Sequence, residues 1–115
     1  MDITLQRLTN LDASERDKLK RLRNFLLDIK KGRTEVLALK DLAVDYLARI
    51  LAFESLGKAE SLTELKRWGI DGDLVQNTLN TLLVLTEKLN LDDKLVEDGI
   101  KIVIRLNKFK PSLSN

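Results

Sequence analysis

The chain has 115 residues, of which 43% are hydrophobic and 33% are charged, and its formal net charge is +2 at pH 7. This length supports one domain rather than two of ordinary size, and this balance of residue types excludes a disordered chain. The sequence contains no cysteine and no histidine, which excludes disulfides, thiolate nucleophiles, the usual zinc sites and a histidine general base, and the expected location is a reducing cytoplasm.

The first predicted helix begins near Ser14, a candidate N-cap that has Asp17 three residues later. Its apolar residues recur at helical spacing from Leu19 to Ile29. We expect the helix to end at residues 30–32, with the sequence KKG, because cations followed by glycine suit the C-terminus of a helix.

A second, longer helix is predicted from Thr34 to about Leu56, with Gly57 beyond it. Apolar residues cover most of its circumference, which is typical of a helix at the centre of a bundle. Its most apolar part, residues 36–53, is interrupted by four charged residues. This part is therefore not a membrane span.

Three shorter helices follow. Residues 61–64, with the sequence SLTE, are a capping box and predict a short helix that ends near residues 68–69. A fourth helix is expected to begin around residues 71–73 and to stop around residue 90, and a fifth, capped by Asp92, is expected over about residues 93–108. No stretch alternates apolar and polar residues between turn signals, so no strand is expected. The sequence predicts an all-α fold, a compact bundle of about five helices without a sheet, in a single domain over the whole chain.

Residues 61–80, with the sequence SLTELKRWGIDGDLVQNTLN, have the layout of a helix-turn-helix, with Gly69 at the turn. The residues with the spacing of a small core between two such helices are Leu65, Trp68, Ile70, Val75 and Leu79. This spacing resembles the helix-turn-helix of bacterial transcription regulators. A regulator that reads DNA with this segment is one hypothesis, and a tight turn between two packed helices is the other.

In the regulator hypothesis, Gln76 and Asn77 are candidate base contacts, because side-chain amides can pair bidentately with adenine. Trp68 is a possible base contact for a different reason, outside the regulator hypothesis: an exposed indole beside a phosphate-binding face would stack on unpaired bases, although the same residue also fits a core position. Asp71 and Asp73 would face phosphates, and no lysine or arginine lies near the start of the second helix. Both observations favour the simple packed turn.

Charge is distributed unevenly along the chain. Residues 1–33 contain nine Lys/Arg and five Asp/Glu, residues 70–100 contain two and seven, and residues 101–115 contain four and none. Basic residues recur at helical spacing on the first and last helices, and chain termini often lie close together, so the two stripes could form one basic face that binds phosphates. The candidate nucleic-acid-binding residues are Arg16, Lys20, Arg21, Arg23, Lys30, Lys31, Arg33, Lys101, Arg105 and Lys108. A solvated helix surface gives the same pattern and stays open as the alternative.

No residue set predicts catalysis. The pair Asp92-Asp93 is better explained as a helix cap and first-turn charge than as an acid–base pair. Asp41 and Asp45, one helical turn apart, could in principle hold Mg²⁺, but they more simply mark the solvent-facing edge of their helix. We therefore expect no enzymatic activity from this chain by itself, and no cofactor or metal site is evident.

The basic first helix (residues 16–33), the apolar second helix, the turn at residues 68–69 and the basic end at residues 101–110 resemble, in layout and composition, the helix-bundle domain that follows the catalytic core in primases of archaeal plasmids. This resemblance covers most of the chain. It implies a non-catalytic module of a larger replication protein, which holds template DNA, single-stranded rather than duplex, beside a polymerising domain. It also implies that nucleotide, as ATP with Mg²⁺, is bound only in that setting.

The competing hypothesis is a bundle that binds other proteins. The predicted last helix is apolar on more of its surface than one inward face needs, which favours a homodimer or a partner helix. The acidic stretch 70–100 of one chain could then face the basic end of another. We expect a DNA-binding module that is not itself catalytic and has no membrane partner, with the regulator and the interaction bundle as alternatives.

Overall fold

The structure, a computed structural model, describes residues 4–55 and 62–109. Over these ranges it contains six helices and no strand: α1 (Thr4–Thr9), α2 (Ala13–Leu27), α3 (Thr34–Ser55), α4 (Leu62–Arg67), α5 (Leu74–Leu89) and α6 (Lys94–Lys108). The predicted all-α fold is confirmed, and α2 to α6 correspond to the five predicted helices. The short helix α1 is additional. Ser61, which starts the predicted capping box of α4, lies outside the described residues.

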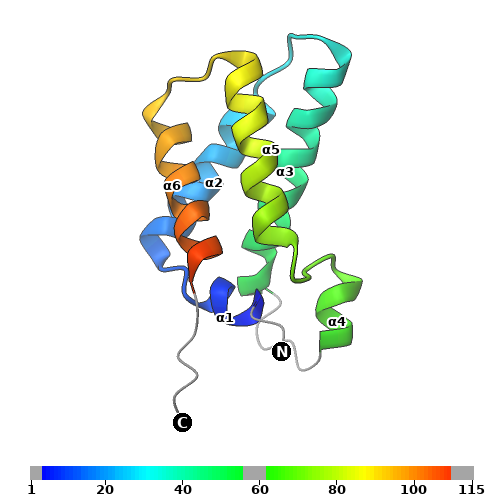
Figure 1. The fold of residues 1–115 in the computed structure, drawn as a ribbon, viewed down its shortest axis with the longest axis vertical. Helices are drawn as coiled ribbons and strands as arrows, with labels where there is room; N and C mark the ends of the chain where they lie inside the picture. The colour runs from blue at the N-terminus through cyan, green and yellow to red at the C-terminus, as the bar shows by residue number, and fades with distance from the viewer. Residues whose placement is uncertain (1–3, 56–61, 110–115) are drawn as a thin grey trace.

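The four long helices α2, α3, α5 and α6 form an antiparallel bundle in which each helix runs opposite to the next (Figure 1). Their contacts close a ring, since α2 packs on α3, α3 on α5, α5 on α6, and α6 on α2. The short helices α1 and α4 lie at the end of the bundle where α5 begins (Figure 1). None of the helices in the described ranges is long and apolar enough to cross a membrane.

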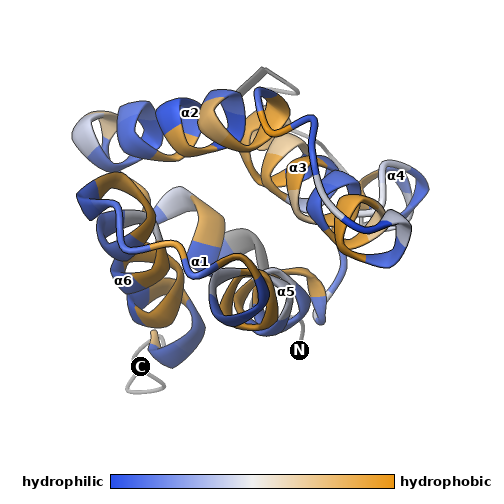
Figure 2. Ribbon diagram, turned by 90° about the horizontal axis from the view of Figure 1, so that it is seen from above, coloured by the Kyte–Doolittle hydropathy of each residue, from blue (hydrophilic) through white to orange (hydrophobic). Residues whose placement is uncertain are grey.

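The core lies inside this ring, and the view from above shows hydrophobic residues on the inward sides of α2 and α6 (Figure 2). Every long helix contributes buried side chains: Leu19, Leu22 and Leu26 from α2, Ala43, Leu47 and Ile50 from α3, Leu74, Leu82 and Leu85 from α5, and Val96, Val103 and Leu106 from α6. Burial of one such leucine is worth about 2 kcal/mol. The bundle is therefore held together mainly by aliphatic packing.

Helix α3 is one side of the ring, and the prediction that it lies at the centre of the bundle is wrong. It packs against α2 and α5, and Leu42 is 40% exposed. Four long helices enclose the core together, so none of them has to be buried all round. Asp41 and Asp45 are exposed, which confirms the predicted solvent-facing edge.

The ends of two helices differ from the prediction. Helix α2 is capped by Asp12 and not by Ser14, because the Asp12 carboxylate accepts the backbone N–H of Glu15 at 2.8 Å and the Glu15 carboxylate accepts that of Asp12 at 3.1 Å. This reciprocal pair satisfies two backbone donors at once. The same helix ends at Leu27, before the predicted residues 30–32. At α6 the cap is Asp93 rather than Asp92, since its carboxylate accepts the N–H of Leu95 at 3.4 Å.

The turn between α4 and α5 is a glycine-terminated helix end. Gly69 has a φ of 76°, and its N–H donates to the Lys66 carbonyl at 2.9 Å, while the N–H of Ile70 donates to the Leu65 carbonyl at 2.9 Å. This pair of bonds is the Schellman arrangement, which turns the chain back on the helix. Ile70 and Leu65 are both buried, whereas Trp68 is 55% exposed. The expected core positions of Leu65 and Ile70 are therefore confirmed, and that of Trp68 is wrong, because the left-handed turn at Gly69 buries Ile70 and leaves Trp68 at the surface.

Candidate functional site

Five of the predicted cations lie exposed on α2 and on the segment that follows it. Lys20, Arg21, Lys30, Lys31 and Arg33 are all exposed, and we call these five residues the basic edge. Arg21 pairs with Asp17 at 3.0 Å, and Arg33 lies 3.9 Å from Glu35. Lys20, Lys30 and Lys31 form no ion pair within residues 4–55 and 62–109. Their ammonium groups are therefore available to a ligand.

The other two predicted residues of α2, Arg16 and Arg23, are half-buried. The Arg16 guanidinium donates to the Leu11 carbonyl oxygen at 3.2 Å, and the Nε atom of Arg23 is buried. Aliphatic parts of such side chains contribute to packing as well as to charge. These two arginines are thus less accessible than the basic edge.

On α6, two of the three predicted cations are engaged by carboxylates. The Arg105 guanidinium donates to both carboxylate oxygens of Glu15, at 2.8 and 2.6 Å. It also donates to the backbone carbonyl of Asn10 at 3.1 Å and to the Asn10 side chain. Lys101 pairs with Glu97 at 2.9 Å. Lys108 is exposed and, among the described residues, has no ion pair.

The Glu97–Lys101 pair is exposed, and each partner shifts the pKa of the other. The hydrogen bond from Lys101, together with its charge, lowers the pKa of Glu97. The same hydrogen bond and the charge of Glu97 raise the pKa of Lys101. Because solvent screens an exposed pair, this contact contributes little to stability.

Helices α2 and α6 are neighbours in the bundle, so the structure brings the two predicted stripes to adjacent helices. The residue that links the two helices, Arg105, is neutralised by Glu15. On α6, the exposed lysines without an ion pair among the described residues are Lys94 and Lys108. Outside the basic edge and α6, further exposed cations lie on α2 (Lys18), α4 (Lys66 and Arg67) and α5 (Lys88).

The predicted base contacts lie apart from the basic edge. Gln76 donates to the Asn80 side chain at 2.8 Å and accepts from the Asn107 side chain at 2.7 Å, which joins α5 to α6. Asn77 is exposed. Trp68 lies between α4 and α5, at the end of the bundle opposite to the segment between α2 and α3 (Figure 1). A base stacked on Trp68 is thus remote from Lys30 and Lys31.

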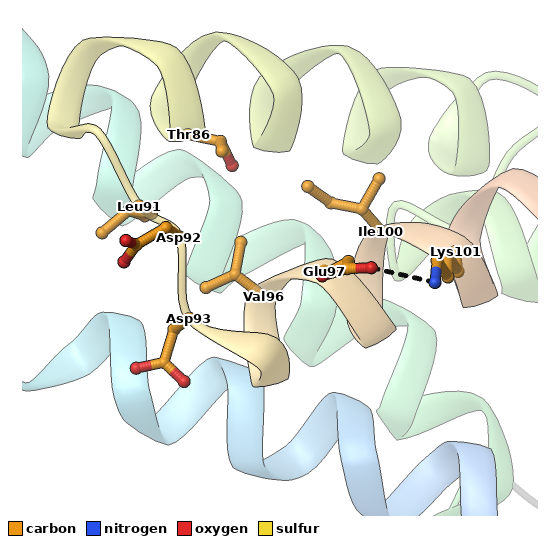
Figure 3. Close-up of a pocket in the computed structure, with 8 residues that line it drawn as sticks. All are labelled: Thr86, Leu91, Asp92, Asp93, Val96, Glu97, Ile100 and Lys101. Carbon is orange, nitrogen blue, oxygen red and sulfur yellow. Dashed lines mark ion pairs between the residues drawn. The ribbon is translucent and has the colours of Figure 1, made fainter.

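A second feature is a groove between α5 and α6, with a volume of about 410 Å³. It is lined by Thr86, Leu91, Asp92, Asp93, Val96, Glu97, Ile100 and Lys101, and we call it the acidic groove. Figure 3 shows aliphatic side chains on one part of its lining and the carboxylates of Asp92 and Asp93 beside the turn into α6. The lining carries three carboxylates and one ammonium group. Such a site suits a ligand that has both an apolar part and a positive charge.

The residues of the acidic groove were not predicted as a site. Asp92 and Asp93 were interpreted only as helix-cap residues. The sequence feature that could have indicated the groove was the last helix, which is apolar on more of its surface than one inward face needs. Ile100 on this helix is only half-buried. The sequence does not show that α5 and the turn at Leu91 form the opposite wall of the groove.

Comparisons of the chain with protein-family models, with curated proteins and with solved structures gave no match in any of the three.

Proposed function

We propose that the chain is a nucleic-acid-binding helical bundle that is not catalytic by itself and contacts phosphates through the basic edge. The observation that carries this proposal is the set of exposed lysines, Lys20, Lys30 and Lys31, which no carboxylate of the described residues neutralises. A lysine that meets a phosphate releases a condensed counterion, and this release drives association. Arg21 and Arg33 add two more cations whose carboxylate partners are themselves exposed.

Single-stranded DNA is the preferred ligand in this proposal. The basic edge follows one helix and the adjoining segment, so it forms a narrow row of charges that suits one backbone. In the setting that the primase resemblance implies, the chain holds a template strand beside a separate catalytic domain, and ATP and Mg²⁺ belong to that assembly. Within the described residues, no group of three or more carboxylates is arranged to hold a metal ion.

The helix-turn-helix regulator is less well supported by the geometry. The side chain of Gln76, which would have to read a base, is bonded to Asn80 and Asn107. A base contact by Gln76 would have to replace both of these hydrogen bonds. Asn77 alone stays open on that face.

The proposal is tested with a charge-reversed variant and a matched control. Lys30→Glu/Lys31→Glu removes two open cations of the basic edge, whereas Lys88→Glu/Lys94→Glu makes the same change in net charge at two other exposed lysines. Fluorescence anisotropy of a labelled single-stranded oligonucleotide compares their affinities. We expect the first variant to lose at least about tenfold, or roughly 1.4 kcal/mol, and the control to lose much less. Equal losses would show that only net charge matters and would contradict a defined basic edge.

A further inference from the structure

The acidic groove and part of the basic edge lie at the same end of the bundle. The segment between α2 and α3 carries Lys30 and Lys31, and the turn between α5 and α6 carries Asp92 (Figure 1). Each molecule therefore presents a positive segment and a negative groove at one end of the bundle. Complementary charges of this kind steer association and fix its orientation.

The free charge of the groove is mainly that of Asp92. The Asp93 carboxylate caps α6 and the Glu97 carboxylate pairs with Lys101. Asp92 is exposed and, within the described residues, forms no ion pair. Leu91 lies next to it, and Val96 and Ile100 line the groove farther along α6 (Figure 3). The groove therefore combines one open carboxylate with an apolar wall.

The segment at the end of α2 has the opposite and matching chemistry. Leu27, the last residue of the helix, is 41% exposed although it is a large aliphatic residue. Lys30 and Lys31 follow it within four residues, and both ammonium groups are open. Residues 27–31 thus present an apolar side chain together with two cations and one exposed carboxylate, that of Asp28, which leaves the segment a net charge of +1. An apolar side chain with a net positive charge is the composition that the acidic groove suits.

We propose that the acidic groove of one molecule receives residues 27–31 of a second copy of the chain, with Leu27 against the apolar wall and the lysines against Asp92. Because each copy carries both the segment and the groove at the same end, the contact can be made twice about a two-fold axis. Such an interface closes as a dimer and does not propagate.

This interface engages two lysines of the basic edge. Self-association and nucleic-acid binding therefore compete for Lys30 and Lys31, a consequence that rests on the proposed function. The dimer itself does not rest on it, and its test contains no nucleic acid. Failure of one proposal is thus distinguishable from failure of the other.

The first test is the mass of the intact chain in solution, measured by sedimentation equilibrium over a range of protein and salt concentrations. We expect the mass to rise with protein concentration from 13.1 kDa to twice that value and no further, and the dimer to weaken as salt screens the charges. A monomer at every accessible concentration, or growth beyond the dimer, would overturn the proposal.

The second test is a charge exchange between two variants. Asp92→Lys reverses the groove and Lys30→Glu/Lys31→Glu reverses the segment, so each variant alone should be monomeric. In a mixture, the positive groove of the Asp92→Lys variant can receive the negative segment of the Lys30→Glu/Lys31→Glu variant. At the second contact of the same dimer, the unchanged segment of the Asp92→Lys variant meets the unchanged groove of the other variant. We expect the mixture to restore the dimer. Asp98→Lys is the control, since it changes the charge equally on α6 but does not line the groove, and it should still dimerise. A mixture that stays monomeric would refute this pairing.

Discussion

Arg105 on α6 and Glu15 on α2 form a two-pronged ion pair, in which the guanidinium donates to both carboxylate oxygens at 2.8 and 2.6 Å. The same Glu15 carboxylate accepts the backbone N–H of Asp12 and so completes the cap of α2. One side chain therefore caps a helix and joins that helix to the last helix of the bundle. The pair is only partly exposed, with 41% of the Arg105 side chain and 18% of the Glu15 side chain accessible.

Replacement of Arg105 should affect the fold. We expect Arg105→Ala to lower the free energy of unfolding by about 1 kcal/mol, since a bidentate charged hydrogen bond is lost at a partly exposed site. Arg105→Lys should not restore this loss, because lysine lacks the planar fork. Urea denaturation measures both, with Lys108→Ala as the control at an unpaired cation. Equal stability of Arg105→Ala and Lys108→Ala would contradict the structural role. A loss of DNA binding in an Arg105 charge reversal would, for the same reason, not identify a phosphate contact.

Gly99 allows α6 to approach α2. A Cβ atom at residue 99 would lie 2.4 Å from the Cδ2 atom of Leu22, which is fully buried. Gly99→Ala should therefore destabilise the protein by about 1 kcal/mol, because overpacking outweighs the gain in helix propensity. In the Leu22→Val background the clashing methyl group is absent, and the same substitution should be neutral or stabilising. Thermal or urea unfolding gives the free energies of unfolding of the unmodified chain, the two single variants and the double variant, and these four values give the interaction energy of the two residues. An identical effect of Gly99→Ala in both backgrounds would show that the two residues do not interact.

Trp68 is the single tryptophan of the chain, so its exposure can be measured directly. We expect its fluorescence to be quenched readily by iodide or acrylamide in the folded protein, with an emission maximum that shifts little on unfolding. Trp68→Ala should change stability by less than about 0.5 kcal/mol, as is usual for exposed positions. A strongly protected, blue-shifted indole would instead place Trp68 in the core.

The Glu97–Lys101 pair should appear in the titration of Glu97. Its pKa in the folded chain is lowered, so the carboxylate stays charged to lower pH, and the small stabilisation from the pair is lost as pH falls through that folded pKa. The raised pKa of Lys101 implies a matching loss as pH rises through it. Carboxyl-carbon NMR should give a Glu97 midpoint below the ordinary value of about 4.3. Lys101→Met should raise it, whereas Lys94→Met should raise it less. No change in Lys101→Met would contradict the pairing.

Nucleic acid should dissociate the dimer. Both interactions use Lys30 and Lys31, so a single-stranded oligonucleotide added to the self-associated chain should convert it to a protein–DNA complex that contains one chain. Sedimentation velocity distinguishes the species. If the dimer binds the oligonucleotide without dissociating, the two surfaces do not overlap as proposed.

The fold class followed from the sequence because apolar residues recur at helical spacing, and because Gly32 and Gly69 lie between helices. The cap of α2 was predicted at Ser14, although Asp12 also has an acidic residue three places later. The contact of Glu15 with Arg105 favours Asp12, and that contact joins residues 90 positions apart. Local rules cannot rank two caps when the deciding partner is so distant.

The candidate site was predictable only in part. Helical spacing placed Arg105 in a basic stripe, but spacing carries no information about a carboxylate on another helix. Trp68 and Ile70 both fitted the core pattern, but only Ile70 is buried, because the left-handed turn at Gly69 leaves Trp68 at the surface. Lys30 and Lys31 are exposed, and their grouping could be predicted because they are adjacent in sequence, whereas their contact with phosphate stays a prediction.

The most direct test of the central claim is fluorescence anisotropy of labelled single- and double-stranded oligonucleotides with the unmodified chain at several salt concentrations. We predict binding to the single strand, with an affinity that falls with salt at a log–log slope of about −0.7 for each phosphate contact. Three to five contacts through the basic edge would give a slope of about −2 to −3.5. An absence of binding to either form at low salt would contradict the claim that this bundle is a nucleic-acid-binding module.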